Sequence, residues 1–419
     1  MNRNPNRILQ AMAGAAMAFA FAVTAQTPAP SAPAAAQTDQ PAAAAAPADQ
    51  SAAPAPLSTF VLTGPLTWLP PATFDAGPMG KLSVNGILTG FSQFQNNHVP
   101  GDDSAQATLS NGQVFIQKAD GKYQYYIQAG VYTMPTLSVP FANAEDTLSN
   151  FYGPVPVAYL KLPVGKTTQF LIGQLPTLMG AESTFTYQNF NIERGIVWNQ
   201  ENAINRGIQV NQALGKYLAA SVSWNDGYYS NRYSWLSGSV TYTKGPHVLV
   251  YDGMGNLGQT AFQKAATPVQ NNGYMHAVIY TYTKGPWIIS PYFQYGKLPA
   301  NEKVGVPKGT SATGGAINAS YAFKSGFSIP ARVEFLTSSG SATDGSVNML
   351  GFGPGSGGFT FTATPTYQKG GMYLRSDFAL VHATDYTTGA VFGKTGTDAN
   401  QFRAVLEFGF IFGKNMTEK

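Results

Sequence analysis

Three arginines in the second half of the chain each have a carboxylate two or four residues further along. The pairs are Arg332 with Glu334, Arg375 with Asp377, and Arg403 with Glu407. Residues at these spacings point to the same face of an extended strand, so each pair places opposite charges side by side. In a water-filled bore, such pairs set up a field that orients polar solutes and tunes ion preference. The alternative is local ion pairing that only satisfies the charges.

A long irregular stretch adds further charges. Residues 175–203 form the longest connection between predicted strands and contain Glu182, Glu193 and Arg194, while Arg206 lies at the start of the next strand. Loops beyond roughly 15 residues are usually functional or disordered. We predict that this loop folds inward and lines a pore constriction; an outer loop over the rim is the alternative. The slight excess of positive charge predicts at most a weak preference for anions.

The sequence offers no arrangement of residues for catalysis, metal binding or cofactor binding. The chain has no cysteine, and His98, His247, His276 and His382 fall in separate elements without the spacing of a metal-binding pair. It also lacks the Gly-x-Ser-x-Gly motif that presents a nucleophilic serine. We therefore predict no catalytic residues, no metal, no cofactor, and a protein that is not an enzyme.

Strands have to position these side chains, and seven short turns indicate where the strands end. Each turn has a lysine near a glycine; the lysines are Lys122, Lys166, Lys216, Lys244, Lys284, Lys324 and Lys369. Longer stretches rich in Asn, Gly, Ser, Asp and Thr lie between the turns. Short turns at one end and long loops at the other are typical of a membrane β-barrel.

The residues between the turns alternate between apolar and polar. From 327 to 335, Phe, Ile, Ala, Val and Phe alternate with Ser, Pro, Arg and Glu. A soluble β-sandwich also alternates, but its polar face is normally dense in Lys and Glu, whereas here that face holds mostly small polar residues. We count about sixteen strands, with about fourteen or eighteen as alternatives. The fold class predicted is all-β, a transmembrane antiparallel β-barrel with short periplasmic turns and long outer loops.

The composition agrees with a barrel. Charged residues make up 11% of the chain and aromatic residues 13%, and the mean hydropathy is −0.10, whereas soluble domains carry roughly a quarter charged residues. The net charge of +4 is spread without a dense basic patch, which argues against nucleic acid. About sixteen strands enclose an aqueous channel. The predicted partners are outer-membrane lipid and small hydrophilic solutes. Because porins of this size commonly form trimers, a homotrimer is the assembly that we consider for this chain.

The first residues have the features of an exported protein. Residues 1–25 are predicted to be a cleaved signal peptide, because Arg3 and Arg7 precede an apolar segment that ends in small residues. Residues 26–56 are a Pro/Ala-rich segment predicted to be a disordered linker. Residues 57–80 form a lead-in segment, either an extra strand or a lumen segment, and 81–419 form the barrel. This organisation predicts the bacterial outer membrane, in the Gram-negative cell envelope.

One stretch carries a family resemblance. Gly173-Gln174-Leu175-Pro176-Thr177, Gly180-Ala181-Glu182, Asn189-Phe190-Asn191 and Arg194-Gly195 are similar to the middle of the β-barrel porin-2 family of outer-membrane proteins. The similarity is best over 170–215. The segment 203–207, Ala-Ile-Asn-Arg-Gly, departs from the Pro and His of many members, so a ligand contact there is not carried over. The resemblance implies an outer-membrane porin whose substrate is generally unassigned.

Taken with the strand pattern, these features predict a porin that lets small hydrophilic solutes or ions diffuse passively through a water-filled barrel. Two alternatives stay open. One is a substrate-specific channel, for example for a sugar, in which Tyr126, Tyr132 and Tyr373 face inward as a stacking track. The other is a non-conducting outer-membrane barrel whose loops bind a ligand or partner.

Overall fold

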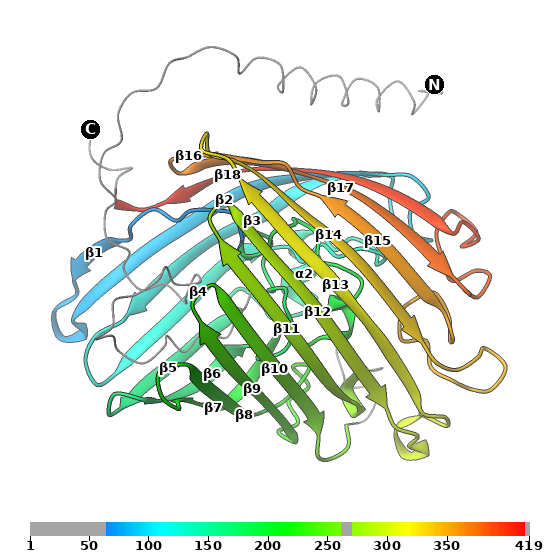
Figure 1. The fold of residues 1–419 in the computed structure, drawn as a ribbon, viewed down its shortest axis with the longest axis horizontal. Helices are drawn as coiled ribbons and strands as arrows, with labels where there is room; N and C mark the ends of the chain where they lie inside the picture. The colour runs from blue at the N-terminus through cyan, green and yellow to red at the C-terminus, as the bar shows by residue number, and fades with distance from the viewer. Residues whose placement is uncertain (1–63, 261–269, 415–419) are drawn as a thin grey trace, which may run out of the picture. The chain divides into compact units, whose positions relative to one another are not determined.

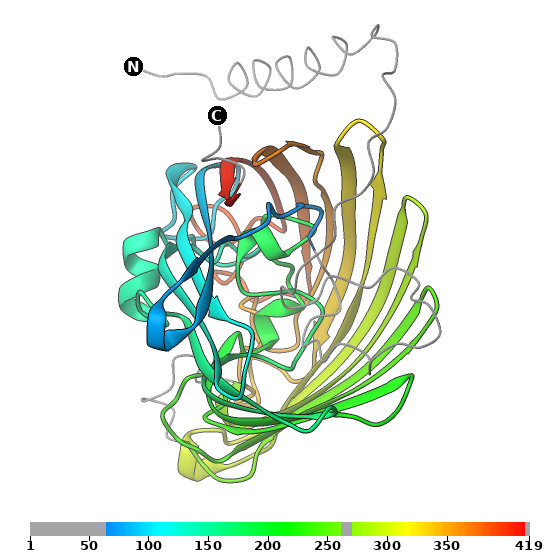
Figure 2. The same cartoon turned by 90° about the vertical axis from the view of Figure 1, so that its left-hand side faces the viewer.

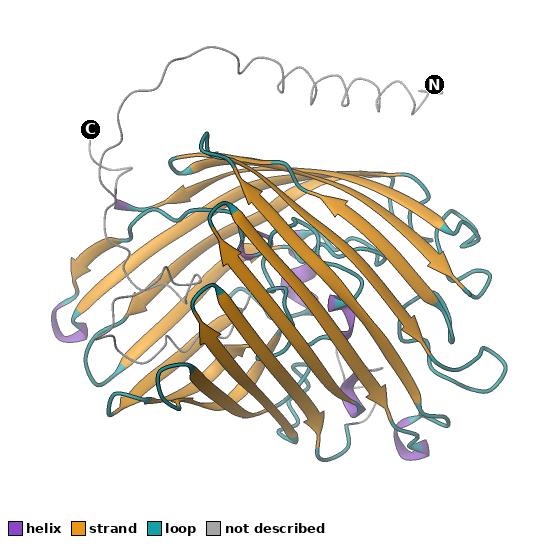
Figure 3. Cartoon of the chain, in the orientation of Figure 1, coloured by secondary structure: helices purple, strands orange, loops and turns teal. Residues whose placement is uncertain are grey.

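A computed structural model describes residues 64–260 and 270–414 of the 419-residue chain. The predicted signal peptide (1–25), the linker (26–56) and the first part of the lead-in segment (57–63) lie outside the described residues. Strands make up most of the described part (Figure 3), and the few helices are short. None of the described helices is long and apolar enough to cross a membrane.

The strands are long and follow one another along the chain. They are β1 Ala72–Asp75, β2 Lys81–Gln95, β3 Ala105–Lys118, β4 Gln124–Tyr132, β5 Val157–Val164, β6 Thr168–Pro176, β7 Ile204–Ala213, β8 Leu218–Asn225, β9 Trp235–Lys244, β10 His247–Asn256, β11 Tyr274–Lys284, β12 Trp287–Leu298, β13 Thr310–Ala322, β14 Phe327–Ser338, β15 Gly357–Ala363, β16 Thr366–Lys369, β17 Met372–Thr384 and β18 Asn400–Phe412. The helices are α2 Ala144–Asn150 and the 3-10 turns η1 Gly77–Met79, η2 Thr186–Gln188, η3 Trp198–Gln200, η5 Gln270–Asn272 and η6 Glu302–Val304.

Antiparallel pairing joins the strands into one closed ring (Figure 1). β18 pairs with β2, which closes the ring. Of the eighteen strands described, β1 is a short addition to β2, and β15 and β16 both pair with β14 and β17 as two parts of one interrupted strand. The ring therefore has sixteen strands, which confirms the predicted fold. Short turns with the predicted lysines join strands at one end, and longer loops join them at the other.

Glycine allows the tightest of the short turns to form. Gly245 and Gly285, in the two Lys-Gly-Pro turns, have φ of +57° and +58°. Two-residue hairpin turns need this left-handed backbone, which glycine adopts without a steric penalty. The recurrence of Thr-Tyr-Thr-Lys-Gly-Pro at 241–246 and 281–286 is thus a repeated solution for one turn geometry.

A β-bulge explains why alternation is lost in the first half of β3. The register between β2 and β3 shifts by one residue and leaves Ser110 without a partner on β2. A bulge breaks the two-residue period and re-aims side chains. Both Ser110 and its neighbour Asn111 are consequently fully buried inside the ring.

The two faces of each strand differ in chemistry. On β14, Val333 and Phe335 are 38% and 53% exposed, whereas Arg332 and Glu334 are 0% and 1% exposed. β17 and β18 follow the same alternation, with their charged residues on the inward face. The outward face thus offers apolar side chains to lipid, and the predicted charge pairs point into the ring.

The outward face predicts a depth-dependent cost for charge. Val333→Arg, in the middle of β14, should destabilise the barrel by about 2–4 kcal/mol, because a charge at the bilayer midplane loses its hydration. Phe323→Arg, at the turn before β14, should cost only about 0–1 kcal/mol. Urea unfolding of both variants in liposomes measures the difference; equal costs would place β14 away from lipid.

Candidate functional site

The connection between β6 and β7, residues 177–203 (L3), runs inside the ring of strands (Figure 2). All of its residues are buried except Gln188, Trp198 and Asn199, which are half-buried. Apart from η2 and η3 it has no regular structure, so its backbone polar groups need partners from outside the loop. Charged side chains on the inward faces of β14, β17 and β18 supply many of them.

Arg332 on β14 holds the middle of L3. Its guanidinium pairs with Glu182 of L3 and lies 3.1 Å from the carboxylate of Glu334. It also donates to the carbonyl oxygen of Glu193 at 2.9 Å. Glu334 in turn accepts the backbone N–H groups of Ile196 and of the next residue, at 3.2 and 3.3 Å. This part of L3 is therefore bound through its backbone.

Arg375 on β17 holds the tip of L3. It pairs with Glu407, which lies directly opposite it on β18. Arg375 donates to the carbonyl oxygens of Thr186 and Asn189 at 3.0 and 3.1 Å. Glu407 accepts the hydroxyl of Thr186 at 2.7 Å and that of Ser110, the bulge residue, at 2.6 Å. The bulge in β3 thus completes the shell around this carboxylate.

Arg403 on β18 forms a third anchor. It lies 2.8 Å from the carboxylate of Glu193 and donates to the carbonyl oxygen of Thr136 at 2.9 Å. Beside it, Asp377 accepts the backbone N–H of Glu193 at 2.8 Å and the hydroxyl of Thr364 at 2.6 Å. Glu193 is consequently fixed by side chain and backbone together.

The two remaining arginines of the predicted set have other surroundings. Arg194 turns back into L3, where it donates to the carbonyl of Thr184 and lies 4.3 Å from the ring centre of Trp198. Arg206 shares the outward strand face with exposed residues of β7 and pairs with Asp226 at 2.7 Å, at the long-loop end. Arg206 therefore does not join the charges inside the ring.

Strand register changes which charges pair. Of the three pairs read from the sequence, Arg332 and Glu334 form an ion pair, whereas Arg375 pairs across strands and Arg403 pairs with L3. Residues directly opposite on neighbouring strands are about 5 Å apart at Cβ, closer than residues two apart on one strand. The sequence pattern identifies the strand face on which each charged residue lies, but it does not identify the residue with which it pairs.

Two glycines of L3 make room for carboxylates. A β-carbon on Gly195 would overlap the carboxylate of Glu334, and one on Gly180 would overlap that of Glu201. Gly180 also has φ of +87°, which disfavours other residues. The backbone N–H of Gly195 donates to Glu182 at 2.8 Å. These glycines let the backbone approach the charges closely.

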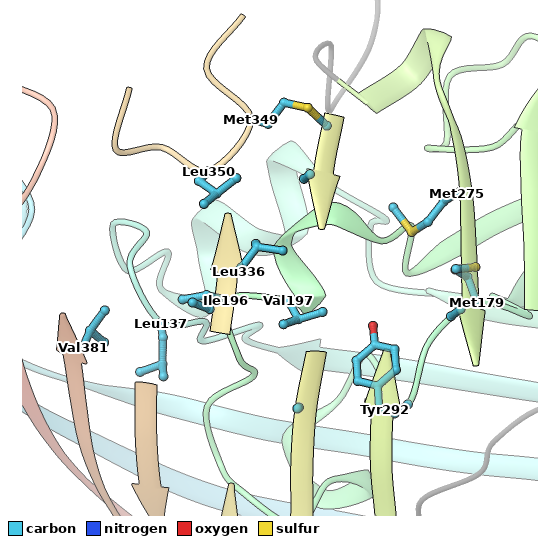
Figure 4. Close-up of a cluster of buried hydrophobic side chains, with 14 of the residues drawn as sticks. Leu137, Met179, Ile196, Val197, Met275, Tyr292, Leu336, Met349, Leu350 and Val381 are labelled. Carbon is cyan, nitrogen blue, oxygen red and sulfur yellow. The ribbon is translucent and has the colours of Figure 1, made fainter. Parts of the chain in front are cut away.

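The opposite side of L3 is apolar. Met179, Ala181, Phe190, Ile196 and Val197 belong to a buried cluster with inward-facing residues of β10–β14. Figure 4 shows Ile196 beside Leu336 of β14 in this cluster. L3 is thus held by charged and by apolar contacts, and β14 and β17 supply both kinds.

Residues 64–71 (the strap) close the short-turn side of L3. Trp68 packs edge-on against Phe115 of β3 and Tyr187 of L3, with ring centres 5.3 and 5.4 Å apart. The backbone N–H and carbonyl of Thr67 both bond to the amide of Gln368, at 2.7 and 2.6 Å. The strap therefore lies in the lumen, while β1, which follows it, adds a short strand to β2.

Burial shifts the ionisation of the acids in L3. Desolvation raises the pKa of Glu182, despite the nearby Arg332 guanidinium, and raises that of Glu201 well above its usual value. Desolvation likewise lowers the pKa of Arg194 to about 9. Glu201 bonds to the hydroxyl of Tyr292 on β12, and one of its carboxylate oxygens has no partner. Burial of docked L3 thus favours the neutral forms of Glu182, Glu201 and Arg194.

Several residues of this site were not among the site residues predicted from the sequence. Glu201 and Asp252 are buried acids beside Gly180, and Thr364 and Ser110 are hydroxyl partners of the charges. Asp252 carried a usable signal, because it is a lone carboxylate on the inward face of β10. Ser110 carried none, since its position depends on a bulge that alternation cannot show.

The arrangement positions a loop in the lumen. In the described ranges, no group of three or more His, Asp and Glu side chains is placed to hold a metal ion. The charges inside the ring are paired with each other or with L3, and carboxylates outnumber arginines there. Of the predicted tyrosine track, Tyr132 and Tyr373 are 0% and 1% exposed, while Tyr126 is half-buried.

Comparisons with known proteins agree with this architecture. Residues 81–412 match the family described as beta-barrel porin-2, OmpL-like. The outer membrane channel DcaP of Acinetobacter baumannii superposes with a TM-score of 0.53 at 12% identity, covering 82% of this chain and 100% of DcaP. In-vitro folded OmpT, an outer membrane protein of Vibrio cholerae, gives 0.52 at 12% identity over 79% and 97%, and its trimer form gives 0.50 at 11% over 79% and 99%. No curated protein matches significantly.

The buried ion pair at the tip of L3 predicts a large stability effect. Glu407→Gln leaves Arg375 without its carboxylate in a site closed to water and should destabilise the barrel by about 3–5 kcal/mol. Asp344→Asn breaks an ion pair with Lys308 in a solvent-exposed loop and should change stability far less, because water screens an exposed pair. Guanidinium unfolding of both variants in detergent micelles compares them; similar losses would mean that the inner pair is solvated.

The raised pKa of Glu201 predicts that docking of L3 weakens as pH rises. The pKa of a free Glu is about 4.3, whereas the docked carboxyl group ionises at a higher pH. As the pH rises above the pKa of the free group, ionisation therefore favours the undocked loop. Ser183→Cys places a thiol on a buried position of L3 in a chain without native cysteine.

Thiol labelling, normalised to a free thiol at each pH, should speed up from about pH 5 to about pH 8. Adding Glu201→Gln should weaken this dependence, with Glu182 supplying the remainder, whereas Glu302→Gln, in an exposed loop, should leave it unchanged. A dependence that is equally steep in Glu201→Gln would remove this carboxyl group from the docking equilibrium.

Proposed function

Since this chain belongs to the beta-barrel porin-2, OmpL-like family, we propose that it passes small hydrophilic solutes through a lumen whose width is set by L3. The chain is an outer-membrane porin, a channel formed by a closed ring of sixteen strands. Rings of this size are wide enough for an aqueous bore. The proposal concerns what narrows that bore.

The binding of L3 by three arginines on β14, β17 and β18 carries this proposal. Arg332, Arg375 and Arg403 each bond to at least one backbone carbonyl, in L3 or in the connection between β4 and β5. A loop held in this way has a defined position in the lumen while it is docked, so it sets the width of the constriction. Glu182 and Glu193 belong to the constriction as partners of the arginines, and Arg206 does not.

The charge count bears on ion preference. The network contains more carboxylates than arginines, but burial favours the neutral form of Glu182 and Glu201 through their raised pKa. The paired groups therefore leave little net field along the lumen. We expect weak ion selectivity without a preferred sign, where the sequence predicted at most a weak preference for anions.

Further parts of the proposal concern assembly and export. A passive channel fits the fixed loop better than an enzyme or a non-conducting binding protein does, because the inner charges support the position of L3. OmpT of Vibrio cholerae has a trimer form, and we extend a homotrimer to this chain on the shared fold. Export with cleavage after residue 25, and a flexible linker at 26–56 before the lead-in and barrel segments, completes the proposed organisation.

Replacing residues 183–199 by a short Gly-Ser linker should raise single-channel conductance several-fold, because L3 would no longer occupy the lumen. Planar-bilayer recording of the refolded protein measures this directly. The matched control shortens 341–345, an exposed loop at the long-loop end, and should leave conductance unchanged.

Because the loop replacement leaves buried arginines without partners, Glu334→Ala serves as a second variant. It removes the acceptor for the backbone of L3 at Ile196 and should give unstable current steps of larger mean size. Wild-type conductance in both variants would contradict the constriction. Silence of the folded wild-type protein would contradict the channel.

A further inference from the structure

Part of the inward-facing surface is only partly covered by L3 and the strap: Tyr126 and Tyr159 pack against a buried cluster that contains residues of both, and each keeps part of its side chain exposed. Half-buried inward positions cluster toward the short-turn end of β4–β9, and they include Tyr126, Tyr159, Gln169, Ser239 and Thr241. Their inward orientation follows from alternation: Val240 and Tyr242, on either side of Thr241, are 43% and 40% exposed on the outward face. This surface is reachable by solvent inside the ring.

This partly covered surface is nearly free of charge. Among the described inward positions of β4–β9 that stay half-buried, Lys161 is the one charged side chain, and it already interacts within the protein. The remaining polar groups are hydroxyls and amides. The paired charges lie instead under L3, on the other side of the ring. A solute here meets hydrogen-bonding groups that do not distinguish ions strongly.

Two tyrosine rings form the centre of this surface. Tyr126 and Tyr159 are directly opposite each other on β4 and β5, and their rings stack with centres 5.5 Å apart and planes at 27°. On the far side of Tyr159, β6 places Gly173, which adds no side chain. Gly173 has φ of +143° and a β-carbon there would collide with the carbonyl of Ala158, so this gap is built into the backbone.

Hydrogen-bonding groups surround the rings. The hydroxyl of Tyr126 lies 3.3 Å from the amide oxygen of Gln128, the next inward residue on β4. Lys161 is the next inward residue after Tyr159 on β5. A flat apolar face beside amides and hydroxyls matches the ring of a sugar, which has C–H groups on its faces and hydroxyls around its edge.

We propose that the Tyr126–Tyr159 surface is a low-affinity subsite for uncharged polyhydroxylated solutes, that is, sugars or polyols, on their way through the lumen. This inference rests on the proposed channel function and names its solute class. The same surface gives little stabilisation to a charged solute, since the inner carboxylates and arginines are engaged with L3. It also replaces the tyrosine track read from the sequence, because Tyr132 and Tyr373 are buried.

Glucose, glucuronate and glucosamine test the solute class, because they share one ring and differ in charge. Swelling rates of liposomes that contain the full-length protein should be several-fold higher for glucose than for the two charged sugars. Equal or faster entry of glucuronate or glucosamine would overturn the preference for uncharged solutes.

Tyrosine variants test the subsite itself. Tyr126→Ala with Tyr159→Ala should raise the half-saturating glucose concentration about tenfold, because the solute loses both aromatic rings of the subsite. Tyr125→Ala, the neighbouring residue on the outward face of β4, is the matched control and should behave as wild type. A double variant that matches this control would overturn the subsite.

Ionic conductance distinguishes failure of the channel function from failure of the sugar subsite. The double variant should keep its conductance in sugar-free salt, which shows that the barrel has folded and remains open. Conductance without sugar entry in the wild-type protein would overturn only the solute class. Absence of both would overturn the channel and this inference together.

Discussion

The irregular backbone of L3, placed inside a barrel, is the constraint on which the rest of the structure depends. Buried N–H and carbonyl groups have to find partners, and a loop without regular structure cannot supply them itself. Arg332 and Arg375 donate to its carbonyl groups, and Glu334 and Asp377 accept its N–H groups. The charged residues that look like pore-lining groups in the sequence are therefore the support of the loop, and the selectivity of the channel falls to the surface that L3 leaves partly exposed.

The architecture of the ring follows from local signals. Alternation with a period of two and glycine-containing turns are properties of short segments, so sixteen strands and their inward faces can be read from the chain. The lost alternation in β3 and the interruption at Pro365 are the places where this reading fails, and both lie beside the site. Ser110 and Thr364, at these two irregularities, hydrogen-bond to Glu407 and Asp377.

The ion-pair partners of the charged residues were harder to predict than the strand faces on which these residues lie. Arg375 faces inward as the pattern indicates, but its ion pair is with Glu407, because the register of β17 against β18 brings these two opposite each other. Register is a property of the assembled sheet. The position of Arg206 was misread for a different reason: alternation along β7 already places it on the outward face with Ile208, where it pairs with Asp226.

The anchors of L3 also determine when it can reach its place. Its contacts with Arg332 and Arg403 join residues 150 and 210 positions apart in the chain, and the last of them come from β18, the strand that closes the ring. Contacts between distant segments form slowly because the intervening chain has to be ordered first. Docking of L3 thus depends on anchors that the closing strand supplies, and we expect it to be a late event in assembly.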